Sequence, residues 1–379
     1  MALVGPMTGE RPVGSAGLEV VALNCGSSSV KGARYRVDRD GEHRLAEASI
    51  ETIASVDRIG EAAQRIYIGL AARGAPDAVG HRFVHGGPKL RTPAFVDDDL
   101  LAELRRAVPI APLHLPAALA AVEAIRVKAP GVPQVVCFDT SFHATLPEAQ
   151  WRLSVPRVLA DEGIRRYGFH GLSYEYVVGA VGAAELGRAV VAHLGNGASL
   201  CAVVDGRSVA TSMGFTPTGG IPMGTRSGDL DPGVLVHLVR AGYDADRLEQ
   251  LVGRESGLLA LGGTSDMAQL LERRQAGDEE AAFAVEVFCV RVAMEIGAYV
   301  TLMGSIDTLV FTAGIGERSA GIRAAVCRRL AHLGVRIDQE RNERNAPVIS
   351  DDGSIVTVRV VQTDEDAVIA RHTRELVAG

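Results

Sequence analysis

The sequence predicts an α/β protein whose two halves share one layout and face each other across a cleft. Its 379 residues exceed the ordinary size of a single hydrophobic core, which favours two domains. An apolar strand, a glycine-rich polar turn and a second apolar strand occur at 20–37 and again at 189–206, which indicates an internal duplication. No low-complexity linker separates the halves, so we expect two lobes in contact.

Composition and charge exclude several classes of protein. Hydrophobic residues make up 47% of the chain and charged residues 22%, as in ordinary soluble proteins, and the net charge of −7 argues against a nucleic-acid partner. No apolar run approaches the roughly 18 residues of a membrane helix. Five scattered cysteines without a CxxC pair suit a reducing compartment, so we expect a cytoplasmic protein without a membrane partner.

The elements of the first half follow from the spacing of its apolar residues. Residues 1–17 have neither a basic nor an apolar signal segment and are expected to be a disordered extension. The patterns predict strands at 18–23, 30–37, 80–87 and 133–143, and helices at 55–73 and from the proline-rich turn 108–119 to residue 128.

The residues that begin and end helices are easier to identify in the second half. Asp231, Pro232 and Gly242 occupy the N-cap, first-turn and terminating positions of one helix. Beyond the repeated hairpin, the patterns predict a helix at 278–303, a strand at 307–317, a helix at 318–333 that ends on Gly334, and a last helix at 364–377 that returns to the first half.

Three glycine-rich turns follow strands, at 24–31, 193–199 and 313–317. Any one of them is most simply a hairpin turn, because turns favour these residues. The first is not a Walker loop, since it lacks GxxxxGK[ST] and a following helix. Three such turns in one chain, one with a lysine and one with an asparagine between glycines, favour a nucleotide-binding protein.

Two arginines lie among residues that are expected to be buried, Arg82 in HRFVHGG and Arg226 in MGTRSGDLDPG. A buried guanidinium needs an anionic partner. That partner is either an internal carboxylate or the carboxylate or phosphate of a substrate, and the sequence leaves both alternatives open.

Three further side chains are candidates for chemistry. Asp139 follows a buried strand and is either a cap or a contributor to a Mg²⁺ site. His170 is either structural or a donor to a transferring phosphoryl group. Glu365 is either a first-turn helix acid or a second metal carboxylate.

Together these motifs resemble the acetate kinase family of the acetate and sugar kinase, Hsp70 and actin superfamily. The resembling blocks span about 24–366, and MGTRSGDLDPG and YGFHG are the most specific of them. In order they are NCGSSSVK, GHRFVHGG, APLHLP, FDTSFH, YGFHG, HLGNGAS, GFTPTGGIPMGTRSGDLDPG, FTAGIGE and TDED.

The resemblance implies two actin-like, ribonuclease H-like domains of duplicated topology around a cleft, in a homodimer. The N-terminal domain would comprise 18–150 and 367–379, and the nucleotide-binding C-terminal domain 151–366. The implied reaction is reversible phosphoryl transfer between ATP and acetate, giving ADP and acetyl phosphate, with Mg²⁺, or Mn²⁺ in its place.

The resemblance also implies roles for individual residues. Arg82 and Arg226 would hold the acyl carboxylate and the transferring phosphoryl group, Asp139 would act beside Mg²⁺, and His170 would stabilise the transition state. The metal side would be formed by Asn24 and Glu365, and the apolar acyl pocket by Val84, Leu113, Phe169 and Pro217. The ATP-binding residues would be Ser27, Ser29, Lys31, His193, Leu194, Gly195, Asn196, Gly197, Asp266, Met267, Ala268, Gly314, Ile315, Gly316, Glu317 and Arg318.

The chain departs from the family pattern at three positions. Tyr174 replaces the histidine that usually ends GFHGxSH, and Asp364 replaces an asparagine. Ala268 replaces an arginine, which puts the adenine contact in doubt.

The chemistry agrees with a carboxylate acceptor. Acetate is already ionised at pH 7, so the enzyme needs positive charge to bring two anions together and has little need of a general base. We therefore expect Asp139 to organise metal and water. The nearest rival is a propionate kinase, against which Val84 favours the smaller acid. A rival of another class, an ATP-gated binding module, would not need Arg82, His170 and Arg226.

Overall fold

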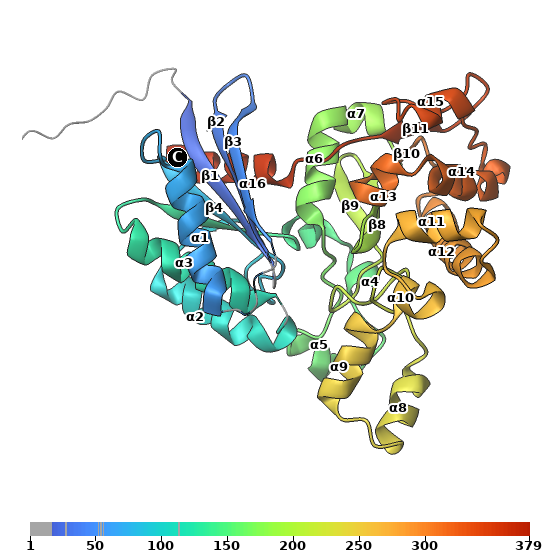
Figure 1. Ribbon diagram of the computed structural model, residues 1–379, viewed down its shortest axis with the longest axis horizontal. Helices are drawn as coiled ribbons and strands as arrows, with labels where there is room; N and C mark the ends of the chain where they lie inside the picture. The colour runs from blue at the N-terminus through green and yellow to red at the C-terminus, as the bar shows by residue number, and fades with distance from the viewer. Residues whose placement is uncertain (1–16, 27–28, 52, 54, 56, 113) are drawn as a thin grey trace, which may run out of the picture.

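The structure is a computed structural model that describes residues 17–26, 29–51, 53, 55, 57–112 and 114–379 (Figure 1). The expected N-terminal extension, apart from Gly17, lies outside the described residues, as do the predicted site residues Ser27 and Leu113.

The first half of the chain forms a six-stranded sheet, sheet A, in the order β3-β2-β1-β4-β6-β5. Strands β1, β2 and β3 are antiparallel neighbours, whereas β4 and β6 run parallel to β1. The strands are β1 (Leu18–Cys25), β2 (Val30–Val37), β3 (Glu42–Ile50), β4 (Ala78–Phe83), β5 (Ala94–Phe95) and β6 (Gln134–Phe138).

The second half forms a five-stranded sheet, sheet B, in the order β11-β10-β7-β8-β9. Strands β7, β8 and β9 form the antiparallel part, and β10 and β11 run parallel to β7. The strands are β7 (Ala189–Leu194), β8 (Ala198–Val204), β9 (Arg207–Thr211), β10 (Thr308–Thr312) and β11 (Thr357–Val360). An antiparallel meander followed by two parallel strands thus occurs twice, which confirms the predicted duplication.

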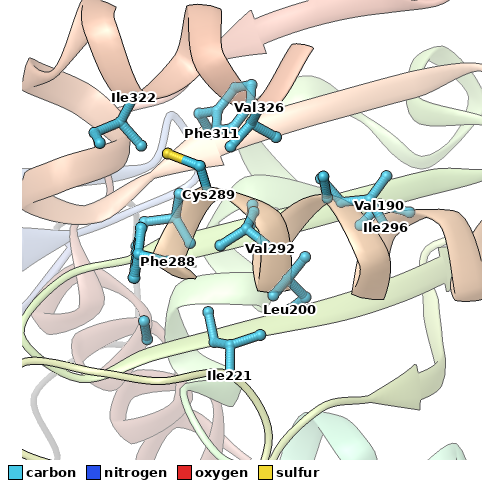
Figure 2. Packing of buried hydrophobic residues seen from close by; sticks show 14 of the residues in the cluster. Val190, Leu200, Ile221, Phe288, Cys289, Val292, Ile296, Phe311, Ile322 and Val326 are labelled. Carbon is cyan, nitrogen blue, oxygen red and sulfur yellow. The ribbon is translucent and has the colours of Figure 1, made fainter. Parts of the chain in front are cut away.

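Helices cover both faces of each sheet, because the central strands bury side chains on both sides. On sheet A, α1 (Asp57–Leu70) and α3 (Leu115–Lys128) cover one face and α16 (Glu365–Ala378) the other. On sheet B, α12 (Glu279–Met303) covers one face, where Phe288, Val292 and Ile296 pack on strand residues (Figure 2).

The remaining helices lie in the segments that connect these layers. They are α2 (Asp98–Ala107), α4 (Glu148–Trp151), α5 (Arg157–Asp161), α6 (Gly171–Val181), α7 (Ala183–Leu186), α8 (Pro232–Arg240), α9 (Ala245–Arg254), α10 (Gly257–Gly262), α11 (Met267–Gln275), α13 (Ala313–Arg318), α14 (Ala320–Arg329) and α15 (Gln339–Glu343). No helix in the described ranges is long and apolar enough to cross a lipid bilayer.

Helix α6 lies between the two lobes (Figure 1) and is apolar around most of its circumference. Leu172 packs in the core of sheet A, while Tyr174 and Val177 pack in the core of sheet B. A helix buried on several sides has no single apolar stripe, so its sequence carries no helical period to detect. Because α6 packs on both sheets, the predicted domain boundaries at 150/151 and 366/367 stay predictions.

Several predicted elements have different bounds in the structure. The predicted strand 307–317 is wrong beyond Thr312, because Ala313 adopts φ +62° and begins the short helix α13. The strand predicted over 133–143 ends at Phe138 and continues as a 3-10 turn. Strand β3, rich in charged and exposed residues, has no apolar alternation and was not predicted. The capped helix at Asp231 is confirmed, with its carboxylate accepting from the amide of Gly233.

An ion-pair cluster joins α16 to α6, with Glu175 accepting from Arg371 and His372, each at 2.9 Å. Burial lowers the pKa of His372, but Glu175 outweighs it and the net pKa is raised above 6.5. Burial raises the pKa of Glu175, but His372 and Arg371 bring it below 4.5. Both His372 and Glu175 are therefore charged in the folded protein between pH 4.5 and 6.5.

Replacing His372 with alanine is expected to lower Tm most between pH 4.5 and 6.5. The contribution of His372 is lost as pH rises through its raised folded pKa, and that of Glu175 as pH falls through its lowered one. Tm measured from pH 4 to 9 for the wild type and His372→Ala tests this. A difference in Tm between the two proteins that stays constant with pH would show that the variant loses only packing.

Candidate active site

The polar side chains predicted from sheet A gather around Arg82, near the end of β4. Its guanidinium donates to both carboxylate oxygens of Asp139, at 2.9 and 2.6 Å, and to Asn24 Oδ1 at 3.1 Å. Glu365, at the start of α16, lies 3.7 Å from Arg82 Nε. Parallel strands place their carboxyl ends at one edge of a sheet, which explains why residues so distant in sequence meet here.

This arrangement settles one alternative that the sequence left open: Arg82 has an internal carboxylate partner. Burial lowers the pKa of Arg82, but Asp139 and Glu365 raise it above its ordinary value, so it is always charged. Burial raises the pKa of Asp139, and the Arg82 guanidinium opposes that shift. Both oxygens of Asp139 are engaged, which suits an organising role better than proton abstraction.

Oxygen ligands for a metal are present in the same cluster. No group of three His, Cys, Asp or Glu side chains in the described part of the chain is arranged to hold a metal ion. Mg²⁺ needs fewer protein ligands, because it is bound through one or two carboxylates, waters and substrate phosphates. Asn24 and Glu365 are of the ligand type that Mg²⁺ prefers, so the residues fit a Mg²⁺ shared with a phosphate substrate.

Arg226 comes from the other half of the chain and differs from Arg82 in its partners. Its Nη1 donates to the carbonyl of Pro217 at 3.0 Å, and no carboxylate pairs with it among the described residues. Burial, followed by repulsion from Arg82, lowers the pKa of Arg226. A half-buried cation without a counter-ion is a site for an anionic ligand.

The loop that carries Arg226 is fixed by its own glycines and by α10. Met223 donates to the carbonyl of Arg226, and the amides of Leu258 and Leu259 bond to carbonyls of Met223 and Gly224. A β-carbon on Gly224 would lie 1.9 Å from Asn196 Oδ1, so any other residue there would displace the Asn196 side chain. The loop is thereby held against the turn that contains Asn196.

His170 is the N-cap residue of α6 and has the left-handed φ of 59°. The next residue, Gly171, donates to the carbonyl of Asp139 at 2.8 Å, and a β-carbon there would lie 2.3 Å from the same oxygen. The GFHG motif therefore needs this glycine to bring His170 against the end of β6.

Two histidines stack inside the site. The rings of His170 and His193 are 4.1 Å apart and inclined by 14°. Burial is the main cause that lowers the pKa of both, that of His193 to about 4, so both are neutral at pH 7. Ser173 Oγ lies 2.8 Å from His193 Nδ1.

Gly197 marks the point where the two halves of the site converge. A β-carbon at this residue would lie 3.4 Å from both His170 Nε2 and Arg226 Nη1. One hydrogen-bond donor of a guanidinium and one ring nitrogen therefore border the same space above the turn 195–197. A guanidinium donor and a ring nitrogen that converge on one point can bind the same anion.

The predicted nucleotide segments lie on neighbouring strands of sheet B. His193 and Leu194 are the last residues of β7. A β-carbon built on Gly195 would lie 3.6 Å from the β-carbon of Ala313, the first residue of α13. In α13, Gly314 and Arg318 are exposed, while Ile315 packs on the core and Gly316 is buried. Glu317 turns inward, where its carboxylate accepts from the amide of Thr363 at 3.3 Å.

Arg323, on α14, holds α13 in place by hydrogen bonds, a role that was not predicted from the sequence. It is fully buried and donates to the carbonyls of Gly316 and Glu317, at 2.8 and 2.9 Å. Burial lowers its pKa to about 10. Its sequence context, IRAAVCRR, gives no sign of this role, because its partners are backbone carbonyls and the side-chain oxygens of Asn342 and Asn345.

Residues 266–268 form the N-cap and first turn of α11. Asp266 is the N-cap, accepting from the amide of Ala268 at 2.8 Å. Met267 is buried in the core of the second half, and Ala268 is exposed. Where the family usually has an arginine, this surface therefore offers only a methyl group.

The two strands of the opening segment are confirmed as an antiparallel pair, with Asn24 opposite Lys31. Opposed residues share one face of a sheet, so Lys31 lies on the side of Asn24. Its ammonium is exposed and 3.5 Å from Glu51. The carbonyl of Ser29 accepts from the amide of Gly26.

The predicted acyl pocket is partly assembled. Val84 packs against the hydrophobic cluster that contains Phe169, across the two halves. Pro217 lines a cavity of about 570 Å³ with His114 and Phe215, and the same residue's carbonyl binds Arg226. The cavity thus opens beside the arginine that has no counter-ion among the described residues.

Comparisons with known proteins agree with these features. Residues 69–371 match the model of the acetokinase family. The chain is 43% identical to an acetate kinase of Micrococcus luteus, over 95% of the chain and 100% of that protein. Two solved structures are similar. A propionate kinase from Francisella tularensis is 33% identical with a TM-score of 0.85, over 94% of this chain and 99% of that one. The acetate kinase of Porphyromonas gingivalis is 36% identical with a TM-score of 0.81, over 96% of this chain and 100% of that one.

Proposed function

The chain belongs to the acetokinase family and is a phosphotransferase, and from this premise we propose that it transfers a phosphoryl group reversibly between ATP and acetate. The products are ADP and acetyl phosphate. The observation that carries this proposal is the convergence of Arg226 Nη1 and His170 Nε2 above Gly197, where Arg226 has no carboxylate partner among the described residues.

In this proposal the residues of the site supply positive charge and orientation. The carboxylate of acetate is the nucleophile, so no proton has to be removed. Arg226 and the neutral His170 donate to the equatorial oxygens of the transferring phosphoryl group, where charge accumulates. Arg82, paired with Asp139, donates through Nη1 to Asn24 and would hold the acyl carboxylate.

Asn24 and Glu365 would hold Mg²⁺ or Mn²⁺, which when bound neutralises charge on the nucleotide phosphates. Asp139, held by Arg82, would orient water around that ion. The turn from His193 to Gly197 would cradle the ATP phosphates, with Ser27, Ser29 and Lys31 at the terminal phosphate. Residues 266–268 and 314–318 would surround adenosine, where Ala268 leaves one contact of the family unmade.

Acetate is expected to have a higher kcat/KM than propionate, because the β-branched Val84 limits the acyl pocket with Phe169 and Pro217. One methylene in such a pocket changes discrimination by about 1–3 kcal/mol, or about 10- to 200-fold. An ATP-dependent hydroxamate assay with acetate, propionate, butyrate and no acceptor measures it.

Two outcomes of that assay would contradict the proposal. A clear preference for propionate would make the enzyme a propionate kinase, as the similar Francisella tularensis protein is named. Hydrolysis of ATP without trapped acyl phosphate from any short acid would favour an ATP-gated module.

We also propose that the enzyme is a cytoplasmic homodimer. All five cysteines are free in the structure, which suits a reducing compartment. Four apolar side chains on and just before α8 are exposed, as at surfaces that associate with another chain: Leu230, Val234, Val236 and Val239.

A further inference from the structure

Behind His170 lies a chain of two buried hydroxyl groups. Ser199, on β8, places its Oγ 2.8 Å from His170 Nδ1, and the phenol oxygen of Tyr174 forms a short hydrogen bond with the same Oγ. Both Ser199 and Tyr174 are fully buried. Neither residue was predicted as part of the site, and Tyr174 is one of the three departures from the family pattern.

The direction of these hydrogen bonds follows from the partners available. In the described residues Ser199 Oγ is the single hydrogen-bond partner of the Tyr174 hydroxyl. If the phenol accepted, its own proton would be buried without an acceptor, which is unfavourable. Tyr174 therefore donates to Ser199. Burial raises the pKa of Tyr174 well above its ordinary value, so the phenol keeps this proton.

Ser199 has one proton, and its oxygen already accepts from Tyr174. Its second lone pair could also accept from His170 Nδ1, but the hydroxyl proton would then be buried without a side-chain acceptor among the described residues. The hydroxyl therefore donates to His170 Nδ1, which accepts. A neutral imidazole that accepts at Nδ1 carries its proton on Nε2. His170 Nε2 is the atom that borders the space above Gly197 with Arg226.

We propose that the hydroxyl chain from Tyr174 through Ser199 fixes His170 in the Nε2-protonated tautomer. Tyr174 and Ser199 are thus positioning residues, because they act through His170 and do not touch the substrate. The alternative tautomer would present a lone pair to the phosphoryl oxygens and repel them. The tautomer assignment stands on geometry, whereas its effect on turnover rests on the proposed function.

The direct test is ¹⁵N NMR of the histidine side chains, with His170 signals identified by their loss in His170→Asn. In the wild type we expect His170 to be protonated on Nε2. In Ser199→Ala, Nδ1 loses the hydroxyl that donates to it, and the Nδ1-protonated form should increase by about tenfold, the worth of one hydrogen bond. In Tyr174→Phe, Ser199 keeps Nδ1 as its acceptor and loses only the polarising bond from the phenol, so the shift should be in the same direction and smaller. Tyr176→Phe removes a hydroxyl from α6 and should leave the spectrum unchanged.

Kinetics test the consequence for turnover. Ser199→Ala is expected to lower kcat by up to about tenfold while KM for acetate and ATP stays within about twofold, since the substrate contacts themselves remain. Tyr174→Phe keeps the mediating hydroxyl and should show a smaller loss of kcat with the same unchanged KM values, and it tests the chain if Ser199→Ala proves unstable. Tyr176→Phe should have the kcat of the wild type.

Each outcome discriminates. Protonation of wild-type His170 on Nδ1, or a Ser199→Ala spectrum identical to the wild type, would overturn the tautomer assignment. A changed tautomer with unchanged kcat would overturn the positioning role. A wild type that is protonated on Nε2 but forms no acyl phosphate would leave the hydroxyl chain intact and refute the proposed function instead.

Discussion

Replacing Arg226 with alanine is expected to lower kcat by about 10³-fold, while the Kd for ATP changes by less than about threefold. Arg226 has no carboxylate partner in the described residues, and it reaches the same space as His170 Nε2. Its contact should strengthen as charge spreads over the transferring phosphoryl group, so most of its effect belongs to the transition state. The hydroxamate assay gives kcat, and titration calorimetry gives the Kd for ATP.

Two matched variants sharpen this prediction. Arg226→Lys keeps the charge but loses the planar pair of donors, so its kcat should lie between those of the wild type and Arg226→Ala. Arg240→Ala removes an exposed arginine from α8 and should behave as the wild type. Equal losses of turnover and of ATP affinity in Arg226→Ala would instead place this arginine on the nucleotide.

Replacing Arg82 with methionine is expected to abolish measurable turnover and to lower the free energy of unfolding by about 3–5 kcal/mol. The cause is Asp139, whose side chain is 2% exposed and would be left without its bidentate partner. A carboxylate in that position is stable only when it is paired or protonated. The penalty should therefore shrink as pH falls and Asp139 takes up a proton.

The double variant Arg82→Met with Asp139→Asn separates stability from catalysis. It removes both charges, so most of the lost free energy of unfolding should return, while turnover stays absent. Arg36→Met provides a surface control, because Arg36 is 52% exposed and pairs with Glu19 at 3.3 Å; it should cost no more than about 1 kcal/mol. Urea unfolding measures all of these. A double variant as unstable as Arg82→Met would mean that packing of the arginine stem, and not charge, is what Arg82 contributes.

Two of the three residues that depart from the family pattern have hydrogen-bond or ion-pair partners far away in the sequence. Asp364 caps α16 and also pairs with Arg44 at 2.7 Å and with the Tyr35 hydroxyl. The charge of Asp364 is therefore matched by a residue on β3, the strand that the sequence did not predict. Tyr174 likewise has a partner, Ser199, on a strand of the other lobe. For Ala268 the structure offers no compensating contact among the described residues.

The sequence by itself determined the features that are encoded in contiguous residues. The repeated strand, turn and strand at 20–37 and 189–206, the cap at Asp231 and the glycines of GFHG and GNG depend on local backbone geometry and on side-chain period. Such features can be predicted from the order of the residues alone. The candidate residues Arg82, Asp139, His170 and Arg226 were found in the same way, from motif blocks that resemble one family.

Only the tertiary structure decided the partners of those residues. Arg82 and Asp139 are separated by 57 positions and meet because β4 and β6 are adjacent and in register. His170 and Ser199 are separated by 29 positions and meet across the interface between α6 and β8. A residue's type and local pattern do not specify which distant group it will face, because that depends on sheet order and on the packing of helices between the sheets. For this reason the sequence named the histidine, and the fold supplied the partners from which we infer which of its nitrogens carries the proton.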